Sequence, residues 1–363
     1  MIKLADVLCE PSLLIALPLK AQSDIISEAR YLNMLAQLKA VFEQANLWDS
    51  LSIHLKQHID SAIPAFSKQQ QHLMNEATMF SEILSPLDIK WVYLKGSAYH
   101  LAKFEEFQGR LMADIDILVS EDALSRVEKV LKEHGWVQTK LNDYDERFYR
   151  EKSQEIPPLK HCERQTELDL HFNILPNTIK ASPDPEILMA QTMSLDSGNS
   201  NAQILTPAAM VIHSSVHLFY ESEFHKGLRD LYDLFLLFTR FSKDALFWDD
   251  LISLQQTLGN GDSQFYALRY CHLVFGLKIP KHVQQFYNQY EPNKAKLLLS
   301  DFAFMRIFVC TFPPHRRLGH QIAENILYIR GHLKRMPIHM LIPHLITKFF
   351  RQLSENKKTT KSQ

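Results

Sequence analysis

The sequence predicts an α+β fold in which a small mixed β-sheet core lies between two helical regions. In the first part of the chain, apolar residues such as Leu38 and Phe42 recur at helical spacing. Two short β-prone runs follow at Lys90–Leu94 and Asp114–Val119, and helical spacing returns from Thr206. We therefore divide the chain into an N-terminal helical region (1–86), an α/β core (87–180), a C-terminal helical domain (181–353) and a disordered tail (354–363).

Residues that favour helix ends mark several elements. Ser120 is a favourable N-cap for a helix that Gly135 would end. Thr206 and Pro207 suit the N-cap and the first position of the next long helix. Between these helices, the polar stretch 141–165 predicts a strand and a loop.

The composition is that of an ordinary globular protein. Hydrophobic residues make up 46% of the 363 residues and charged residues 22%, while only 10 glycines and 16 prolines are present. These values exclude collagen-like and low-complexity chains. The formal net charge of −1 provides no overall positive field that would indicate a nucleic-acid partner.

The cysteines and the apolar segments predict a cytoplasmic protein. The run Leu13–Leu17 is short for a secretory signal, and Asp301 and Arg306 interrupt the apolar segment Leu297–Phe312, so we expect no transmembrane segment. Scattered cysteines that lack metal-site or redox spacing are usually reduced thiols. The four cysteines are Cys9, Cys162, Cys271 and Cys310.

The run from Asp114 to Val119 carries two carboxylates at alternate positions. Because residues i and i+2 of a strand point to the same face, the side chains of Asp114 and Asp116 project together. Adjacent carboxylates repel each other unless a cation neutralises them, and oxygen ligands of this kind favour Mg²⁺ or Mn²⁺. The pattern predicts a metal site, although an Asp-x-Asp sequence is also common in solvated turns.

A second motif, Leu94-Lys95-Gly96-Ser97, ends one predicted strand and begins a helix. A Gly-Ser turn at the start of a helix presents backbone N–H groups and allows phosphate to approach closely. Lys95 and Arg110 add positive charge nearby in the sequence. We therefore expect Lys95, Gly96, Ser97 and Arg110 to bind phosphates; a simple strand-to-helix turn is the alternative for Gly96.

A third motif lies on the predicted strand Thr166–Phe172. Glu167, Asp169 and His171 alternate onto one face of this strand. If the strand lies next to the one that carries Asp116, Asp169 becomes a third carboxylate of the same site. Phosphoryl chemistry with two metal ions requires ligands of this type.

Together these motifs resemble the DNA polymerase beta-type nucleotidyltransferase superfamily, in which a strand, a Gly-Ser turn and a helix precede an Asp-x-Asp strand and a later strand with a single Asp. Leu94-Lys95-Gly96, Arg110, the run Asp114 to Val119 and Leu168-Asp169-Leu170-His171 resemble more closely a poorly characterised bacterial branch, the nucleotidyltransferase-family proteins. The resemblance covers about residues 88–175.

The resemblance implies a role for each motif residue. Asp114 and Asp116 would be metal ligands, Asp169 the third carboxylate, and Gly96-Ser97 the phosphate turn. The sequence departs from the superfamily in one respect, because residues 98–113 make the gap between Ser97 and Asp114 longer than usual. This departure bears on the direct phosphate contact of Ser97 more than on the carboxylates.

The implied function is the metal-dependent transfer of a nucleoside monophosphate from an NTP to an acceptor, with release of pyrophosphate. Asp114, Asp116 and Asp169 would be the catalytic residues, with Mg²⁺ or Mn²⁺ as the cofactor. The NTP and an acceptor that the sequence does not identify would be the partners. The alternative is a non-catalytic nucleotide-binding protein or an antitoxin-like interaction protein that retains the fold.

Two further groups of polar residues lie in the C-terminal helical domain. His213 and His217 have helical spacing but no acidic partner at zinc-protease spacing, so we expect them to line the seam between helices and core. Arg229 and Asp233 lie off the apolar stripe of their helix, where they would either face the substrate or form an interdomain salt bridge.

The segment 315–351 is basic and amphipathic. It contains one acid, Glu324, and seven basic residues: Arg316, Arg317, Arg330, Lys334, Arg335, Lys348 and Arg351. Such a surface can bind anionic lipid, nucleic acid or an acidic face of the same protein. We favour docking on the catalytic core of the same chain over contact with a membrane surface or nucleic acid.

Overall fold

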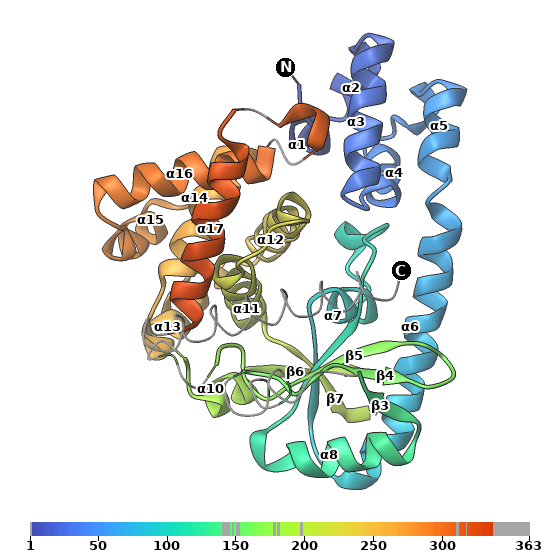
Figure 1. Cartoon of the computed structure of the whole chain (residues 1–363), viewed down its shortest axis with the longest axis vertical. Helices are drawn as coiled ribbons and strands as arrows, with labels where there is room; N and C mark the ends of the chain where they lie inside the picture. Colours follow the sequence, from blue (N-terminus) through green and yellow to red (C-terminus); the bar gives the residue numbers. More distant parts are fainter. Residues whose placement is uncertain are drawn as a thin grey trace, which may run out of the picture.

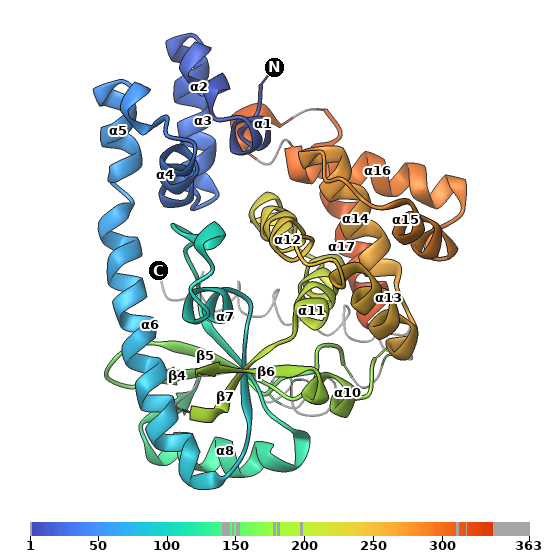
Figure 2. The same ribbon diagram turned by 180° about the vertical axis from the view of Figure 1, so that it is seen from behind.

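The computed structural model describes residues 2–139, 146, 149, 153–176, 179, 182–196, 199–309, 312–316 and 318–336. The predicted tail, 354–363, and residues 337–351 of the basic segment lie outside the described residues. Within the described part, the fold is α+β, with helices on either side of one mixed sheet (Figures 1 and 2).

The N-terminal region is helical, as the apolar spacing predicts. Leu38 and Phe42 are fully buried on one face of α4, and Ser52 accepts a hydrogen bond from the backbone N–H of Leu55 at the start of α5. The helices are α1 (Leu4–Cys9), α2 (Ser12–Ala16), α3 (Leu19–Tyr31), α4 (Leu35–Gln44), α5 (Ile53–Asp60) and α6 (Ile63–Leu84), with 3₁₀ turns at Trp48–Ser50 and Ser85–Leu87.

The sheet has seven strands in the order β3-β4-β5-β2-β1-β7-β6. Its strands are β1 (Trp91–Leu94), β2 (Ile115–Leu118), β3 (Trp136–Gln138), β4 (Leu159–His161), β5 (Glu167–His171), β6 (Thr192–Asp196) and β7 (Asn199–Leu205). Pairing is parallel between β1 and β7 and between β2 and β5, and antiparallel at the other four junctions. The sheet is therefore mixed, as predicted.

The sheet is larger than the small core that the sequence predicts. Its last two strands, β6 and β7, come from 192–205, a stretch for which no strand was predicted. β7 pairs with β1 in the middle of the sheet, and this pairing depends on residues far apart in the chain. Alternation in the isolated stretch is too weak to show that it joins a sheet, because β pairing is stabilised by neighbouring strands.

Helices cover both faces of the sheet. On one face lie the lower half of α6 and α8 (Glu121–Glu133), which buries Val127 and Leu131 as the predicted apolar stripe (Figure 1). On the other face lie α7 (Lys95–Leu101) and α11 (Pro207–Tyr220) (Figure 2). Thr206 precedes α11 and Pro207 begins it, as predicted.

The C-terminal region packs around α11, which is buried on nearly all sides because most of its residues are apolar. Phe219 of α11 stacks on Tyr266 and Tyr270, and Phe304 completes this aromatic core. The other helices are α10 (Pro185–Ala190), α12 (Gly227–Phe241), α13 (Phe247–Leu258), α14 (Asp262–Phe275), α15 (Lys281–Tyr287), α16 (Lys294–Val309) and α17 (His320–Arg335), and 3₁₀ turns lie at Glu105–Phe107, Asn288–Tyr290 and Pro313–His315.

None of the helices in the described part of the chain combines the length and the hydrophobicity needed to cross a membrane. Cys9, Cys162 and Cys271 are free thiols, and only Cys271 is buried.

Candidate active site

A cavity of about 640 Å³ opens between the sheet and the helices α11, α12 and α17. Most of the residues that the sequence singles out converge on this cavity. They are Lys95, Gly96, Arg110, Asp114, Asp116 and Asp169. Ser97 is the exception, because its side chain is buried behind the cavity wall.

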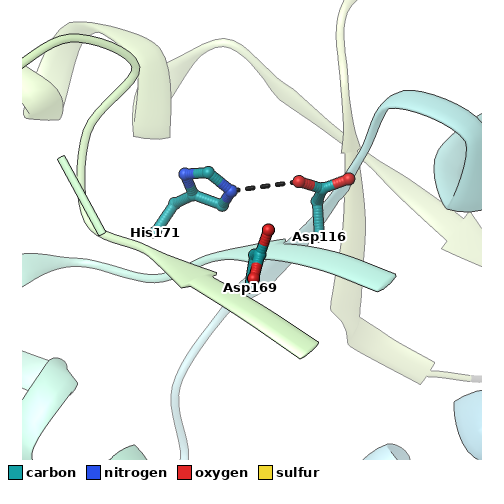
Figure 3. A group of neighbouring side chains, drawn as sticks. All are labelled: Asp116, Asp169 and His171. Atoms are coloured by element: carbon teal, nitrogen blue, oxygen red, sulfur yellow. Dashed lines mark hydrogen bonds and ion pairs between the residues drawn. The ribbon is translucent and has the colours of Figure 1, made fainter. Parts of the chain in front are cut away.

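The parallel pairing of β2 and β5 brings two of the predicted carboxylates together. Asp116 lies directly beside Asp169 in the register of the two strands. His171, two residues further along β5, points to the same face, and its Nε2 lies 3.1 Å from Oδ1 of Asp116 (Figure 3). One donor atom from each of Asp116, Asp169 and His171 lies within 4.8 Å of the others.

Asp114 lines the same cavity but lies outside this tight cluster. It precedes β2, which begins at Ile115, so its backbone is one residue outside the ladder that holds Asp116. Burial, followed by the negative charge of Asp116, raises the pKa of the Asp114 carboxyl. The two carboxylates that the sequence places on one strand face therefore do interact electrostatically.

Helix α6 anchors the segments that carry the acidic residues. Gln69 donates to the backbone C=O of Met112 and accepts from its N–H, both at 2.8 Å, just before Asp114. Glu76 accepts two hydrogen bonds from Arg164, at 2.6 and 3.0 Å, and another from Thr166, which precedes β5. These contacts fix the starts of β2 and β5 against the same helix.

The charges of the cluster are strongly coupled. Burial and the nearby carboxylates of Glu155, Asp116 and Asp114 raise the pKa of Asp169 to about 7. Burial alone would raise the pKa of Asp116, but Lys95 and His171 outweigh it and hold that pKa well below its usual range. Burial lowers the pKa of His171, but the charges of Glu155 and Asp116 raise it by more, so the pKa lies above its usual value.

Lys95 reaches the cluster from the end of β1. Its Nζ donates a hydrogen bond of 2.7 Å to Oδ1 of Asp116. Its backbone has a φ of +49°, in the left-handed region that a lysine seldom adopts and that costs about 1 kcal/mol or more. The fold maintains this strain at the position from which the ammonium group meets Asp116.

Arg110 lies against the glycine turn. Its Nε donates to Oδ2 of Asp233 at 2.7 Å, and both side chains are more than 90% buried. A Cβ atom on Gly96 would come within 2.2 Å of Nη1 of Arg110, so only glycine leaves room for the guanidinium. Arg110 is thus placed beside the turn, but one of its donors is already bound to the chain's own carboxylate.

Ser97 has a structural contact. Its hydroxyl donates a hydrogen bond of 2.7 Å to the backbone C=O of Leu94. Because α7 begins at Lys95, Gly96 and Ser97 belong to the first turn of this helix. The Ser97 side chain is directed into the protein, and only its backbone remains available for the predicted phosphate role.

A model of a family described as uncharacterised nucleotidyltransferase matches residues 20–276 of this chain. The chain belongs to this family. A search of the curated proteins and a search of the solved structures each found no match. The matched range includes α6, the whole sheet, α11 and α12. It therefore contains the cluster and two of the three helices that border the cavity, whereas α17 lies outside it.

The donor set of the cluster fits a divalent cation. Three carboxylates lie in or beside the cluster, and burial, followed by the neighbouring carboxylates, raises the pKa of both Asp169 and Asp114. Carboxylate oxygens are the preferred ligands of Mg²⁺ and Mn²⁺. A bound cation would offset both the burial and the mutual repulsion that raise these pKa values.

Two residues beside the carboxylates were not predicted as site residues. For His171 a signal existed, because alternation places it on the same strand face as Asp169. Glu155 lies 3.2 Å from Nδ1 of His171, and it reaches this position through an isolated antiparallel bridge to His171. The sequence contains no comparable signal for Glu155, since the bridge depends on the path of the chain before β4.

The helical wall of the cavity contains the other polar residues considered above. His213 and His217 stack on α11 at the seam with the sheet, and burial lowers the pKa of His213 to about 3. Arg229 binds Asp230 on its own helix, whereas Asp233 forms the salt bridge to Arg110. Asp233 thus forms a salt bridge with Arg110, while both Arg229 and Asp233 also line the cavity, so the substrate-facing alternative stays a prediction.

The described part of the basic segment is paired with acids of the helical region. Lys334 forms an ion pair with Asp262, and Arg335 forms one with Glu221 at the cavity wall. Arg330 donates a hydrogen bond of 2.7 Å to the backbone C=O of Phe219. These contacts attach α17 to α11 and α14 of the same chain.

Proposed function

We propose that this protein transfers a nucleoside monophosphate from an NTP to an acceptor hydroxyl or phosphate and releases pyrophosphate. The observation that carries the proposal is the register of β2 and β5, which places Asp116 beside Asp169 at the base of a cavity bordered by Lys95 and Gly96. Membership of a nucleotidyltransferase family supports the same reaction class.

Asp114, Asp116 and Asp169 are the residues that would hold Mg²⁺ or Mn²⁺. When bound, the cations neutralise charge on the phosphates and favour the deprotonated form of the attacking hydroxyl. Asp169 has the pKa that burial and the neighbouring carboxylates raise to about 7, and we assign to it both metal ligation and help in deprotonating the acceptor. Asp114 and Asp116 orient the triphosphate side of the site.

The basic residues and the glycine turn have the complementary role. Lys95 is shared between Asp116 and an incoming phosphate, and its charge is maintained because Asp116 and Asp114 raise its pKa against the effect of burial. Gly96 permits close approach of phosphate and of Arg110. The backbone of Ser97 and the guanidinium of Arg110 complete the phosphate contacts that we propose.

The reaction replaces one phosphorus–oxygen bond by another. The acceptor oxygen bonds to the α-phosphorus, the bond from that phosphorus to the bridging oxygen breaks, and the bond electrons leave with pyrophosphate. The acceptor proton passes to Asp169 and then to solvent. The acceptor is not identified, and a cytoplasmic location remains a prediction from the sequence.

Pyrophosphate release from labelled NTPs in the presence of Mg²⁺ tests this proposal. We expect Asp116→Ala to abolish release, because this residue lies at the centre of the cluster. Asp49→Ala provides a matched control, since Asp49 is fully exposed far from the cavity and should leave release unchanged. Equal release from Asp116→Ala and the unaltered protein would contradict the proposal, and nucleotide binding that is independent of Mg²⁺ would favour a non-catalytic binding protein.

A further inference from the structure

We infer that His171 is a metal ligand through Nε2, held by Glu155, so that the site takes a divalent cation that accepts nitrogen, such as Mn²⁺, in preference to Mg²⁺. The inference rests on the proposed function for the presence of a divalent-cation site. It adds the identity of one ligand, the residue that orients this ligand, and the chemical class of cation that follows.

His171 lies where it can bind a cation together with Asp116 and Asp169. Its Nε2 lies 3.1 Å from the carboxylate oxygen of Asp116, and Asp169, two residues earlier on the same strand as His171, is paired in register with Asp116 (Figure 3). Two ligands of one cation, each about 2.1 Å from it, are separated by up to about 4.2 Å. Because the three donor atoms already lie within 4.8 Å of one another, small side-chain shifts suffice.

Glu155 occupies the other side of the ring. Its Oε2 lies 3.2 Å from Nδ1 of His171. Histidines that bind metals almost always donate their second N–H to a carboxylate or carbonyl, which fixes the tautomer and directs the free nitrogen at the metal. A proton kept on Nδ1, on the side that faces Glu155, leaves the lone pair of Nε2 for a cation bound beside Asp116 and Asp169.

The backbone holds His171 rigidly from both sides. The C=O of His171 accepts a hydrogen bond from Val119 at 3.0 Å, beyond the end of β2. On the opposite side, Ile156 donates to Leu170 at 3.1 Å and Phe172 donates to Gln154 at 2.9 Å, on either side of Glu155. The imidazole and its carboxylate partner are therefore placed by the sheet itself, which gives the preorganised geometry that a metal site requires.

An imidazole in the donor set changes which cation is preferred. Mg²⁺ demands oxygen ligands and near-ideal octahedral geometry, so a nitrogen donor contributes little to its binding. Mn²⁺ also prefers carboxylates but, as the first member of the divalent transition-metal series, it accepts a nitrogen donor more readily than Mg²⁺ does. A site made of Asp116, Asp169 and His171 should thus bind Mn²⁺ more tightly than Mg²⁺.

The test measures metal binding in the full-length protein without nucleotide. Titration with Mn²⁺ and with Mg²⁺ gives the two affinities, and pulsed electron paramagnetic resonance of the Mn²⁺ complex detects coupling to a directly bound nitrogen. Incorporation of ¹⁵N-labelled histidine should shift this coupling. We expect His171→Gln to lower the Mn²⁺ affinity at least tenfold, and Glu155→Gln to lower it about tenfold, with a smaller effect of either change on Mg²⁺.

His217→Gln is the matched control, since it removes another imidazole that lines the same cavity. It should leave the nitrogen coupling and the Mn²⁺ affinity unchanged. The spectrum of the unaltered protein decides the inference even if His171→Gln does not fold: Mn²⁺ bound without histidine nitrogen coupling overturns it. If this coupling is present but no NTP yields pyrophosphate, the inference stands and the proposed function fails.

Discussion

The buried pair between Arg110 and Asp233 offers a quantitative test of how the C-terminal helices support the cavity. Both side chains are more than 90% buried, and one 2.7 Å contact joins them. Removing one partner of a buried pair leaves an uncompensated charge and costs about 3–5 kcal/mol. Burial raises the pKa of Asp233 to about 6 despite Arg110, so the pair only partly offsets its desolvation and the lower figure applies.

We therefore expect Asp233→Asn to lower the free energy of unfolding by about 3 kcal/mol, measured by urea unfolding followed by circular dichroism. Asp301→Asn is the matched control. Asp301 binds Arg269 through two contacts, at 2.8 and 2.6 Å, but both side chains are about one-quarter exposed, so the loss should be about 1 kcal/mol. Equal losses from the two variants would refute the reasoning.

The same pair should also affect nucleotide binding, because Asp233 holds Arg110 beside Gly96. We expect Asp233→Asn to raise the KM for NTP about tenfold with a smaller change in kcat, and Asp301→Asn to change neither. The double variant Arg110→Met/Asp233→Leu removes both charges, and its free energy of unfolding should be closer to that of the unaltered protein than the value for either single variant. Additive losses of stability would show that the two charges do not compensate each other.

Two further predictions concern other parts of the chain. Gln69→Ala removes both hydrogen bonds to Met112 and should lower the unfolding free energy by about 2 kcal/mol. It should also raise the Mg²⁺ concentration needed for half-maximal pyrophosphate release. Substitution of the exposed Gln71 by Ala should change neither quantity, and equal effects of the two variants would show that Gln69 does not position Asp114. Burial raises the pKa of Glu28 from 4.5 to about 7, so its contribution to stability is complete below pH 4.5 and lost as the pH rises to about 7. The free energy of unfolding of Glu28→Gln, measured with urea, should rise by about 3 kcal/mol relative to that of the unaltered protein as the pH increases from 4.5 to 8. If the unfolding free energies of the two proteins change in parallel with pH, the assigned pKa is contradicted.

Much of the fold was predictable because its signals are local. The helical spacing around Leu38 and Phe42, the N-cap at Thr206 and the β-prone runs at β1 and β2 each depend on a few neighbouring residues. β6 and β7 had no such signal. They are strands because β1 provides a parallel partner for β7, and this pairing is a property of the folded chain.

The candidate site divides in the same way. The spacing of Asp114 and Asp116 and the alternation of Asp169 with His171 determine that these side chains share strand faces, since side-chain direction on a strand follows from the backbone alone. Their mutual distances do not follow from spacing. Only the parallel register of β2 with β5 brings Asp116 beside Asp169.

The sequence by itself thus determined which residue types this protein has for metal and phosphate chemistry, and on which faces they lie, because these properties are local to each strand. The tertiary structure decided which of them meet. It tied Arg110 to Asp233, turned the Ser97 hydroxyl into the protein, and placed Glu155 against His171. The contacts of Arg110 with Asp233 and of Glu155 with His171 join separate segments through packing and burial, and no local pattern in the sequence records them.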